Sequence, residues 1–306
     1  MKKIRRGFML LRNAGTAFSE DNAFKLSASL SYYTLFALGP LLIIIISLAG
    51  IFFGVDAVQG RVYQQLNGLV GSSAALQIQD IISNAHHTHA TVAGATIGAV
   101  ILVIGATGVF TEMQSSINFI WSVKAKPKKG WLKFLINRLI SFSLIIGLGF
   151  LLLVSLIVNA LLTILSDRLT RLFPNYSVYL FNIINLAIIL AVITLLFSVI
   201  YKVLPDAVIS WKDALIGAAF TALLFLIGKF LIGFYLGKSN MGVSFGAAAS
   251  VVVLLTWVYY SSLILYFGAE FTKIYALHSG AGIKPKQTAV FIIKRETTEV
   301  QYSRLD

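Results

Sequence analysis

The sequence predicts an all-α membrane protein with six transmembrane helices, both termini in the cytoplasm, and an amphipathic interfacial helix before the first span. Composition gives the first indication: 58% of the 306 residues are apolar and 12% are charged, about half the charged fraction of soluble domains. The mean hydropathy is +0.84, and apolar residues fall in long runs between short basic stretches. The third indication is the one-sided distribution of Lys and Arg along the chain.

The six spans follow from the length of the apolar runs. A bilayer core of about 30 Å requires about 20 apolar residues per helical crossing. Six stretches meet this requirement: 30–53, 92–111, 139–165, 180–203, 214–235 and 243–269. An even number of spans places both termini on the same side. The run 139–165 is longer than one crossing needs, so we expect that helix to tilt or to project beyond the bilayer.

Basic residues set the orientation of the spans. Of the 25 Lys and Arg residues, twenty fall on the side of the two termini, four fall on the opposite side, and Lys229 lies inside the fifth span. The positive-inside rule therefore places both termini in the cytoplasm. The same distribution accounts for the net charge of +13 without nucleic acid as a partner, because loops beside anionic headgroups need these charges for topology.

The chain divides into three predicted regions. Residues 1–29 form an amphipathic N-terminal segment, residues 30–277 form the transmembrane domain with an extracytoplasmic segment at 54–91, and residues 278–306 form a cytoplasmic tail. Near the N-terminus, apolar residues recur at near-helical spacing between basic residues, which predicts a helix lying on the membrane surface. These residues are Ile4, Phe8, Leu11 and Phe18.

Charged residues in or beside the spans are the first candidates for function, because an unpaired charge in the bilayer is costly. Glu112 ends the second span, Glu270 ends the sixth, and Asp21 precedes the first. In one interpretation, each glutamate pairs with a nearby base such as Arg138 or Lys273. In the other, both glutamates face a shared cytoplasmic-side cavity that binds a cation or a proton, and Asp21 joins them.

Lys229 and two amides complete the set of candidate binding residues. Lys229 lies six residues before Tyr235, about 9 Å below the outer end of the fifth span. Its ammonium either snorkels to the outer headgroups or binds an anionic substrate. Gln114 and Asn118 are four residues apart, so they share one face if the second helix continues past Glu112.

Motifs of soluble enzymes are missing from the sequence. The chain contains no Walker loop, no HExxH, no GxSxG and no dinucleotide fingerprint, so we expect no enzymatic activity and no cofactor. Zero cysteines exclude disulfides and thiolate metal sites. His86, His87 and His89 lack a carboxylate at ligand spacing and read as a solvated loop, so we expect no metal site.

Three blocks of the sequence resemble one known family. They are DNAFKLSASLSYYTLFALGPLL at 21–42, VFTEMQSSINFIWSVKAKPKKGWLKFLINRLISF at 109–142, and a third block at 204–271. The third block contains LPD, W-x-D-A, YLGKSN, FGAAAS, TWVYYSS and GAEF in that order. Together the blocks resemble the BrkB/YihY family of bacterial inner-membrane proteins. The chain has Phe245-Gly246 where many relatives have Tyr-Gly, a difference of one hydroxyl.

This resemblance implies a six-span protein of the bacterial inner membrane with cytoplasmic termini. Members of the family were formerly labelled ribonuclease BN, and have since been proposed as envelope-lipid or lipopolysaccharide-precursor transporters, solute or sodium exporters, and virulence factors. The leading hypothesis is therefore a transporter or lipid translocator whose partners are membrane lipids and a small solute or cation. A non-transporting envelope scaffold is the alternative, and a membrane-bound ribonuclease is a remote one.

Overall fold

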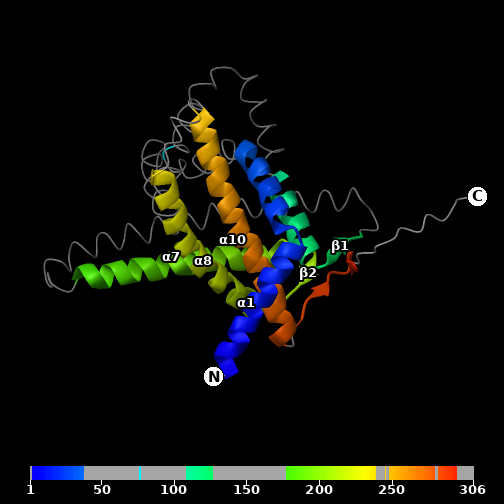
Figure 1. The fold of residues 1–306 in the computed structure, drawn as a ribbon. Coiled ribbons are helices and arrows are strands. Elements are labelled where there is room, and N and C mark those ends of the chain that lie inside the picture. The colour runs from blue at the N-terminus through cyan, green and yellow to red at the C-terminus, as the bar shows by residue number, and fades with distance from the viewer. Residues whose placement is uncertain are drawn as a thin grey trace, which may run out of the picture.

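The computed structural model describes residues 2–37, 76, 108–126, 177–238, 245, 248–279 and 282–294. These residues form the helices α1 (Lys2–Glu20), α7 (Ser177–Val203), α8 (Trp211–Lys238) and α10 (Ala249–Ser279), together with helical segments at 23–37 and 108–120. Short strands complete the described fold: β1 (Val123–Ala125), β2 (Ala207–Val208), β3 (Lys284–Pro285) and β4 (Ala289–Phe291). Figure 1 shows α8, α10 and the two helical segments gathered together, with the strands to one side.

Three of the predicted spans are confirmed as helices long and apolar enough to cross a membrane. They cover Ile183–Val203, Trp211–Leu236 and Val251–His278, with 21, 26 and 28 residues. The last helix begins later than predicted and continues further, so Glu270 lies inside α10 rather than at its end. Residues 139–165 and most of 30–53, 54–91 and 92–111 lie outside the described residues. The count of six spans and the orientation therefore stay predictions.

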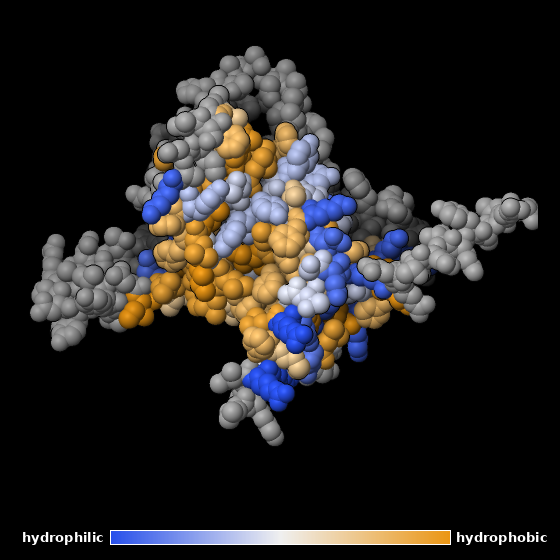
Figure 2. All heavy atoms as spheres, viewed as in Figure 1, coloured by the Kyte–Doolittle hydropathy of each residue, from blue (hydrophilic) through white to orange (hydrophobic). Residues whose placement is uncertain are grey.

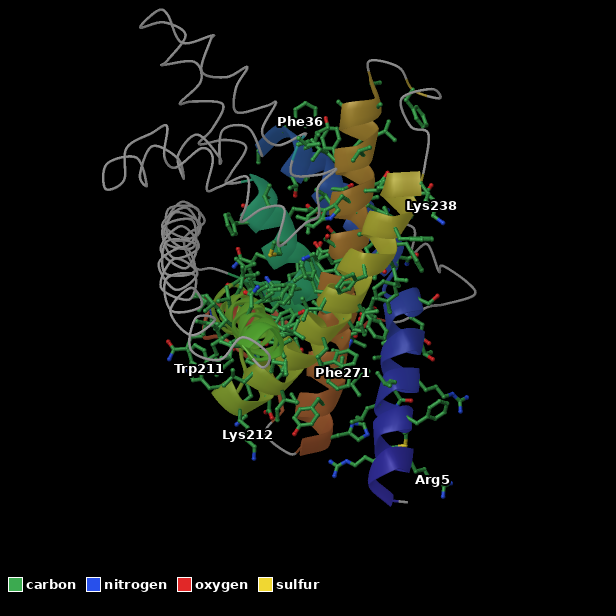
Figure 3. The ribbon with its side chains drawn as sticks, turned by 90° about the vertical axis from the view of Figure 1, so that its left-hand side faces the viewer. Arg5, Phe36, Trp211, Lys212, Lys238 and Phe271 are labelled. Atoms are coloured by element: carbon green, nitrogen blue, oxygen red, sulfur yellow. The ribbon has the colours of Figure 1, made fainter. Side chains whose placement is uncertain are left out.

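Labelled side chains identify the two ends of the helix bundle. Figure 3 places Trp211 and Lys212, at the start of α8, and Arg5 of α1 toward one end, whereas Lys238 and Phe36 lie toward the other. We call the first of these the α10 carboxyl end, because α10 runs antiparallel to α8 and finishes there. It is the end that the charge distribution assigns to the cytoplasm.

α8 and α10 approach closely through two reciprocal Gly/Thr pairs. Gly217 of α8 lies against Thr272 of α10, and Gly268 of α10 lies against Thr221 of α8, with no room for a Cβ at either glycine. Each threonine hydroxyl donates a hydrogen bond to the carbonyl of the glycine four residues earlier, at 2.8 Å in α8 and 2.6 Å in α10. Small residues at both contact points let the two backbones pack tightly, as membrane helices do without a hydrophobic driving force.

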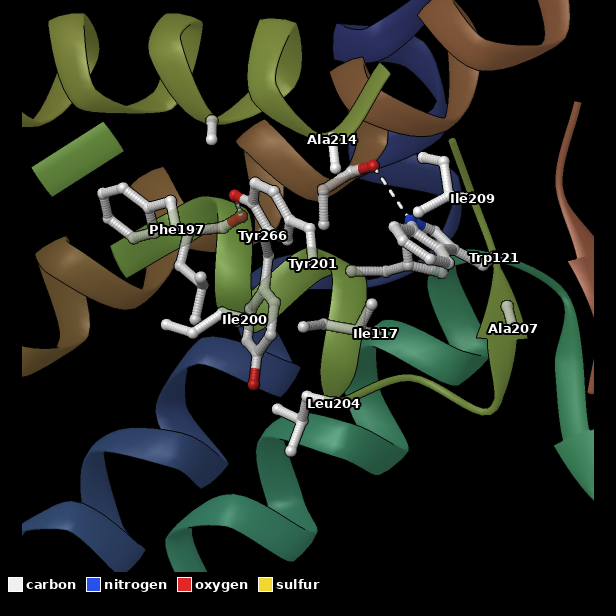
Figure 4. Packing of buried hydrophobic residues seen from close by; sticks show 14 of the residues in the cluster. Ile117, Trp121, Phe197, Ile200, Tyr201, Leu204, Ala207, Ile209, Ala214 and Tyr266 are labelled. Carbon is white, nitrogen blue, oxygen red and sulfur yellow. Dashed lines mark hydrogen bonds between the residues drawn. The ribbon is translucent and has the colours of Figure 1, made fainter. Parts of the chain in front are cut away.

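Aromatic side chains fill the space between α7, α10 and the segment 108–120. The Tyr201 hydroxyl donates to the Leu265 carbonyl at 2.8 Å, which joins α7 to α10. The Trp121 Nε1 donates to the Ala269 carbonyl at 3.1 Å, which joins the end of segment 108–120 to α10 (Figure 4). Ile117 and Tyr266 are fully buried in the same cluster. The core therefore places the end of segment 108–120 directly beside the carboxyl-terminal half of α10.

Large apolar side chains also cover the outside of the helices. Phe230 and Phe234 of α8 are 71% and 65% exposed, and Ile183 of α7 is 66% exposed. Figure 2 shows apolar residues over much of the visible face, with strongly hydrophilic residues gathered mainly at α1 and near the strands. Helices that are apolar on all sides are typical of membrane spans.

α1 presents two apolar stripes, where the sequence predicted a single lipid-facing one. Leu10 and Ala14 are buried against Phe271 and Ile274 of α10, which α1 crosses (Figure 1). Phe8, by contrast, is 71% exposed, and Leu11 beside it is also exposed. The predicted apolar face is therefore divided: Phe18 is buried in the bundle, whereas Phe8 and Leu11 remain exposed beside Arg5 and Arg12, as an interfacial helix requires.

The residues after α10 fold back along the bundle as strands. β3 pairs with β2, and β4 pairs with β1, both antiparallel. The Ile292 amide then donates to the Ser122 carbonyl at 2.8 Å, and the Lys286 amide donates to the Asp206 carbonyl at 2.9 Å. We call residues 282–294 the return segment. It joins the ends of segment 108–120 and of α7 at the α10 carboxyl end.

A side chain at Gly268 should destabilise the bundle. The substitution Gly268→Val places a branched side chain against Thr221 and Tyr201, and overpacking of this kind costs about 1–3 kcal/mol. We expect a lower free energy of unfolding of the purified protein in mixed micelles. Gly233→Ala on α8 is the matched control, since a Cβ there meets nothing within 4 Å. Equal stability of the two variants would contradict the tight helix contact.

Candidate functional site

A half-buried lysine brings the charges together at the α10 carboxyl end. The Lys273 ammonium donates a hydrogen bond to the Ile120 carbonyl at 2.7 Å. The same nitrogen lies 2.9 Å from Glu270 Oε2 and 3.5 Å from Asp21 Oδ2. Lys294 of the return segment donates to Asp21 Oδ1 at 2.6 Å. Asp21, Glu270, Lys273 and Lys294 are called the charge cluster below.

The local backbone explains why Asp21 points into this cluster. Asn22 adopts a positive φ of 52°, a conformation that Asn tolerates better than most residues. The left-handed residue breaks the chain between α1 and segment 23–37 and lets the two helices diverge. Asp21 then lies immediately before the amino end of segment 23–37, where the helix dipole favours a negative charge. Its side chain is buried.

Glu270 is the least compensated member of the charge cluster. The residue has no exposed surface, and apart from the Lys273 ammonium, 2.9 Å from Oε2, neither carboxylate oxygen has a hydrogen-bond donor among the residues that the structure describes. Its compensation is the ion pair with Lys273, which also serves Asp21. A buried ion pair offsets its desolvation only when further hydrogen bonds satisfy the charged groups. Glu270 is thus held in the bundle with capacity to bind one more proton or cation.

Amides and a carboxylate form a second polar group beside the charge cluster. Asn118 Nδ2 donates to Asp206 Oδ2 at 2.9 Å, and Asn118 Oδ1 accepts from the Asp206 amide at 2.8 Å. Gln114 Nε2 donates to the same carboxylate oxygen at 3.3 Å. All three residues are buried. The paired hydrogen bonds fix the loop after α7 against segment 108–120.

A cavity of about 440 Å³ opens beside this polar group. Its walls come from segment 108–120, from β1, from the loop after α7 and from the return segment. Gln114, Asn118 and Asp206 supply polar groups, Lys124 supplies a positive charge, and Phe119 and Ile292 supply apolar surface. The volume and the mixture of apolar walls with a few polar groups are typical of small-molecule sites.

Phe119 connects the cavity to the charge cluster. Its ring lines the cavity, and the Lys294 ammonium lies 4.0 Å from the ring centroid. Lys294 therefore contacts both an aromatic face and the Asp21 carboxylate. Two residues, about half a turn of segment 108–120, separate the two polar groups, since Asn118 faces the cavity and the Ile120 carbonyl accepts from Lys273.

The predicted site residues fall into three places. Asp21 and Glu270 come together in the charge cluster through Lys273, and Gln114 and Asn118 come together on Asp206. Glu112 is half-buried and forms no ion pair with any described residue. It lies eight residues before Ile120, roughly 12 Å along the helix axis. Neither Glu112 nor Glu270 lines the cavity beside Asp206, and a different cavity shared by the two glutamates stays a prediction.

Lys229 is also remote from the charge cluster. It is half-buried on α8 next to Gly228, which packs against Tyr260 and Ile264 of α10. Those residues precede Glu270 by six to ten positions, roughly 9–15 Å along the axis. Either predicted role of Lys229, snorkelling or anion binding, belongs to a place away from the charge cluster.

Sequence reasoning passed over Asp206 and Lys294 and considered Lys273 only as a partner for a glutamate. Asp206 belongs to the LPD block and precedes the two-residue strand β2. The sequence feature that could have identified it is an acidic residue shortly after an apolar helix. Lys294 carried no sequence signal, because its place depends on the long-range pairing of β4 with β1.

Comparison with known proteins agrees with this membrane architecture. The family described as Virulence factor BrkB matches residues 14–292. The chain belongs to the BrkB family. The match includes the charge cluster up to residue 292 and the cavity, with Lys294 just beyond it. No solved structure matches the chain.

Curated relatives carry the name UPF0761 membrane protein. One from Pseudomonas aeruginosa is 29% identical over 263 residues, covering 82% of this chain and 59% of the relative. One from Azotobacter vinelandii is 28% identical, covering 83% and 60%. One from Psychromonas ingrahamii is 27% identical over 281 residues and covers 89% of both chains. The chain thus spans about three fifths of the Pseudomonas and Azotobacter relatives.

Removal of the central ammonium should destabilise the fold. Lys273→Met leaves the buried Glu270 carboxylate without its cation, which lowers the free energy of unfolding by about 3 kcal/mol. This value is at the low end for broken buried ion pairs, because the Lys273 side chain is 18% exposed. Unfolding in mixed micelles measures the loss. Lys212→Met, an exposed lysine on α8, is the control and should change stability by less than about 0.5 kcal/mol. Equal effects would show that the charge cluster does not hold the helices together.

Loss of the Asn118 amide should also be costly. Asn118→Leu removes the acceptor of the buried Asp206 amide and one donor to its carboxylate, and unsatisfied buried groups cost about 1–3 kcal/mol each. The same unfolding assay applies. Ser115→Ala, which lines the cavity with an exposed side chain, should be near neutral. A stable Asn118→Leu variant would contradict the assigned hydrogen bonds.

Proposed function

We propose that this chain is a transporter or lipid translocator of the bacterial inner membrane, and that the charge cluster and the adjoining cavity form its working site. The observation that carries the proposal is Glu270, a carboxylate with no exposed surface whose donor among the described residues is the Lys273 ammonium that it shares with Asp21. Ionisable groups inside membrane helices are costly and commonly mark ion or substrate pathways.

The charge cluster has the composition that alternate binding requires. Lys273 lies between Glu270 and Asp21 and pairs with both carboxylates, whereas Lys294 pairs with Asp21 alone. Binding of a proton or small cation by one carboxylate frees Lys273 to pair more strongly with the other. Such a redistribution changes the contacts among α10, the turn at Asp21 and segment 108–120, which are the elements that the cluster joins.

The lining of the cavity fits a transported molecule that has both polar and apolar parts. Its volume of about 440 Å³ suits a headgroup or a small solute, and its walls combine Gln114, Asn118 and Asp206 with Phe119 and Ile292. Lys124 adds a positive charge at the rim of the same cavity. Movement of a lipid headgroup through the protein, with its acyl chains in the bilayer, fits the apolar exterior of α7 and α8.

Proteoliposomes test the proposal directly. The protein is reconstituted with acyl-chain-labelled phospholipid, and transfer between leaflets is followed by quenching of the outer leaflet. We expect transfer by the wild type and at least about a tenfold lower rate for Glu270→Gln, because the amide cannot alternate between charged and neutral forms. Glu112→Gln should lose less, since Glu112 lies outside the charge cluster.

Glu20→Gln is the matched control, because Glu20 is exposed at the end of α1, one residue before Asp21. Melting temperatures of all variants show whether they fold. If no phospholipid moves, the same vesicles are tested for uptake of sodium ions or protons. Folded protein that moves neither lipid nor ions, or a Glu270→Gln variant as active as wild type, would contradict the proposal and favour a non-transporting envelope scaffold.

A further inference from the structure

Lys294 occupies a site whose chemistry is that of an ammonium receptor. Its nitrogen donates to Asp21 Oδ1 at 2.6 Å and lies 4.0 Å from the centre of the Phe119 ring. A carboxylate oxygen supplies a charge-assisted hydrogen bond, and an aromatic face attracts a cation through its quadrupole. A ring face offers no lone pair to a metal ion, so this pair of groups favours an organic ammonium.

The charges of the cluster require a cation at this position. When both are ionised, Asp21 and Glu270 carry two negative charges, which the two positive charges of Lys273 and Lys294 balance. Withdrawal of Lys294 leaves one uncompensated negative charge beside buried groups, which is strongly unfavourable. A monovalent cation that enters the same place restores neutrality.

The return segment holds Lys294 in place with few interactions. β4 pairs with β1 over three residues, β3 pairs with β2 over two, and Lys294 follows three residues after β4. Two-stranded pairs of this length are marginal on their own. The side chain of Lys294 is also 30% exposed, in contrast to the buried Asp21. The ammonium can therefore leave its site at lower cost than the buried members of the cluster on or beside the helices.

We propose that Asp21 and Phe119 form a binding site for the primary ammonium group of a ligand, which Lys294 occupies until the ligand displaces it. Phe119 also lines the cavity, so the remainder of such a ligand has space next to its ammonium. The identification of this ligand with a transported molecule rests on the proposed function, whereas the binding site itself does not. The ammonium belongs either to a lipid headgroup such as ethanolamine or to a soluble amine.

Binding is measured on the full chain in detergent, without any transport assay. Thermal unfolding is followed in ethylammonium chloride, with sodium chloride and tetramethylammonium chloride at equal ionic strength. We expect Lys294→Met to be stabilised by ethylammonium at a concentration at least about tenfold lower than the wild type requires, because the internal competitor is gone. Tetramethylammonium, which has no N–H donor for Asp21, should act more weakly.

Three further variants make the result specific. Lys284→Met, an exposed lysine of the same return segment, should respond as the wild type does. In the Lys294→Met background, Asp21→Asn should abolish the ethylammonium response, and Phe119→Leu, which retains apolar bulk without the ring, should weaken it several-fold. The Phe119→Leu variant keeps the test valid if the Asp21→Asn variant does not fold.

Two outcomes overturn the inference: no specific stabilisation of Lys294→Met by ethylammonium, or an equal response to sodium. Once the specific response is seen, nanodiscs assign the source of the ammonium. Stabilisation of Lys294→Met by phosphatidylethanolamine over phosphatidylcholine identifies a lipid headgroup, and its absence identifies a soluble amine. These experiments measure melting temperatures and not transport. A failure of transport in vesicles therefore leaves the ammonium site unaffected, and a failure of ammonium binding leaves the proposed transport unaffected.

Discussion

The Lys273 ammonium joins segments of the chain that lie far apart in sequence. Its three N–H donors face the Ile120 carbonyl, Glu270 and Asp21, which belong to three different elements. A desolvated charge needs its partners close by, so the end of segment 108–120, the turn after α1 and α10 have to meet at one point. Lys294 brings the return segment to the same point through Asp21.

Helix packing determines which way the charged residues of α10 point. Gly268 and Thr272 lie on the face of α10 that contacts α8. Two residues turn about 200° around a helix, so Glu270, midway between them, points to the opposite face. That face meets the turn at Asp21 and the end of segment 108–120. The close approach of two membrane helices thus fixes the position of a carboxylate that could not be buried without Lys273.

The sequence predicted those features that depend on local pattern. Apolar run length predicted the spans that became α7, α8 and α10, and a spacing of four predicted that Gln114 and Asn118 share a face. Features that depend on long-range pairing were not predictable: strands of two or three residues have no periodicity, so neither the return segment nor the place of Lys294 could be foreseen. Segment 108–120 continues about two turns beyond Glu112, and Glu112 lies outside the charge cluster that holds Glu270.

The ion pair of Glu270 with Lys273 is the central interaction of the charge cluster, and a double-mutant cycle measures it directly. Free energies of unfolding are compared for the wild type, Glu270→Gln, Lys273→Met and the double variant. Groups in one buried network couple by about 0.5–3 kcal/mol, and the account predicts a coupling above about 1 kcal/mol, with the double variant more stable than Lys273→Met. Additive effects of the two substitutions would contradict it.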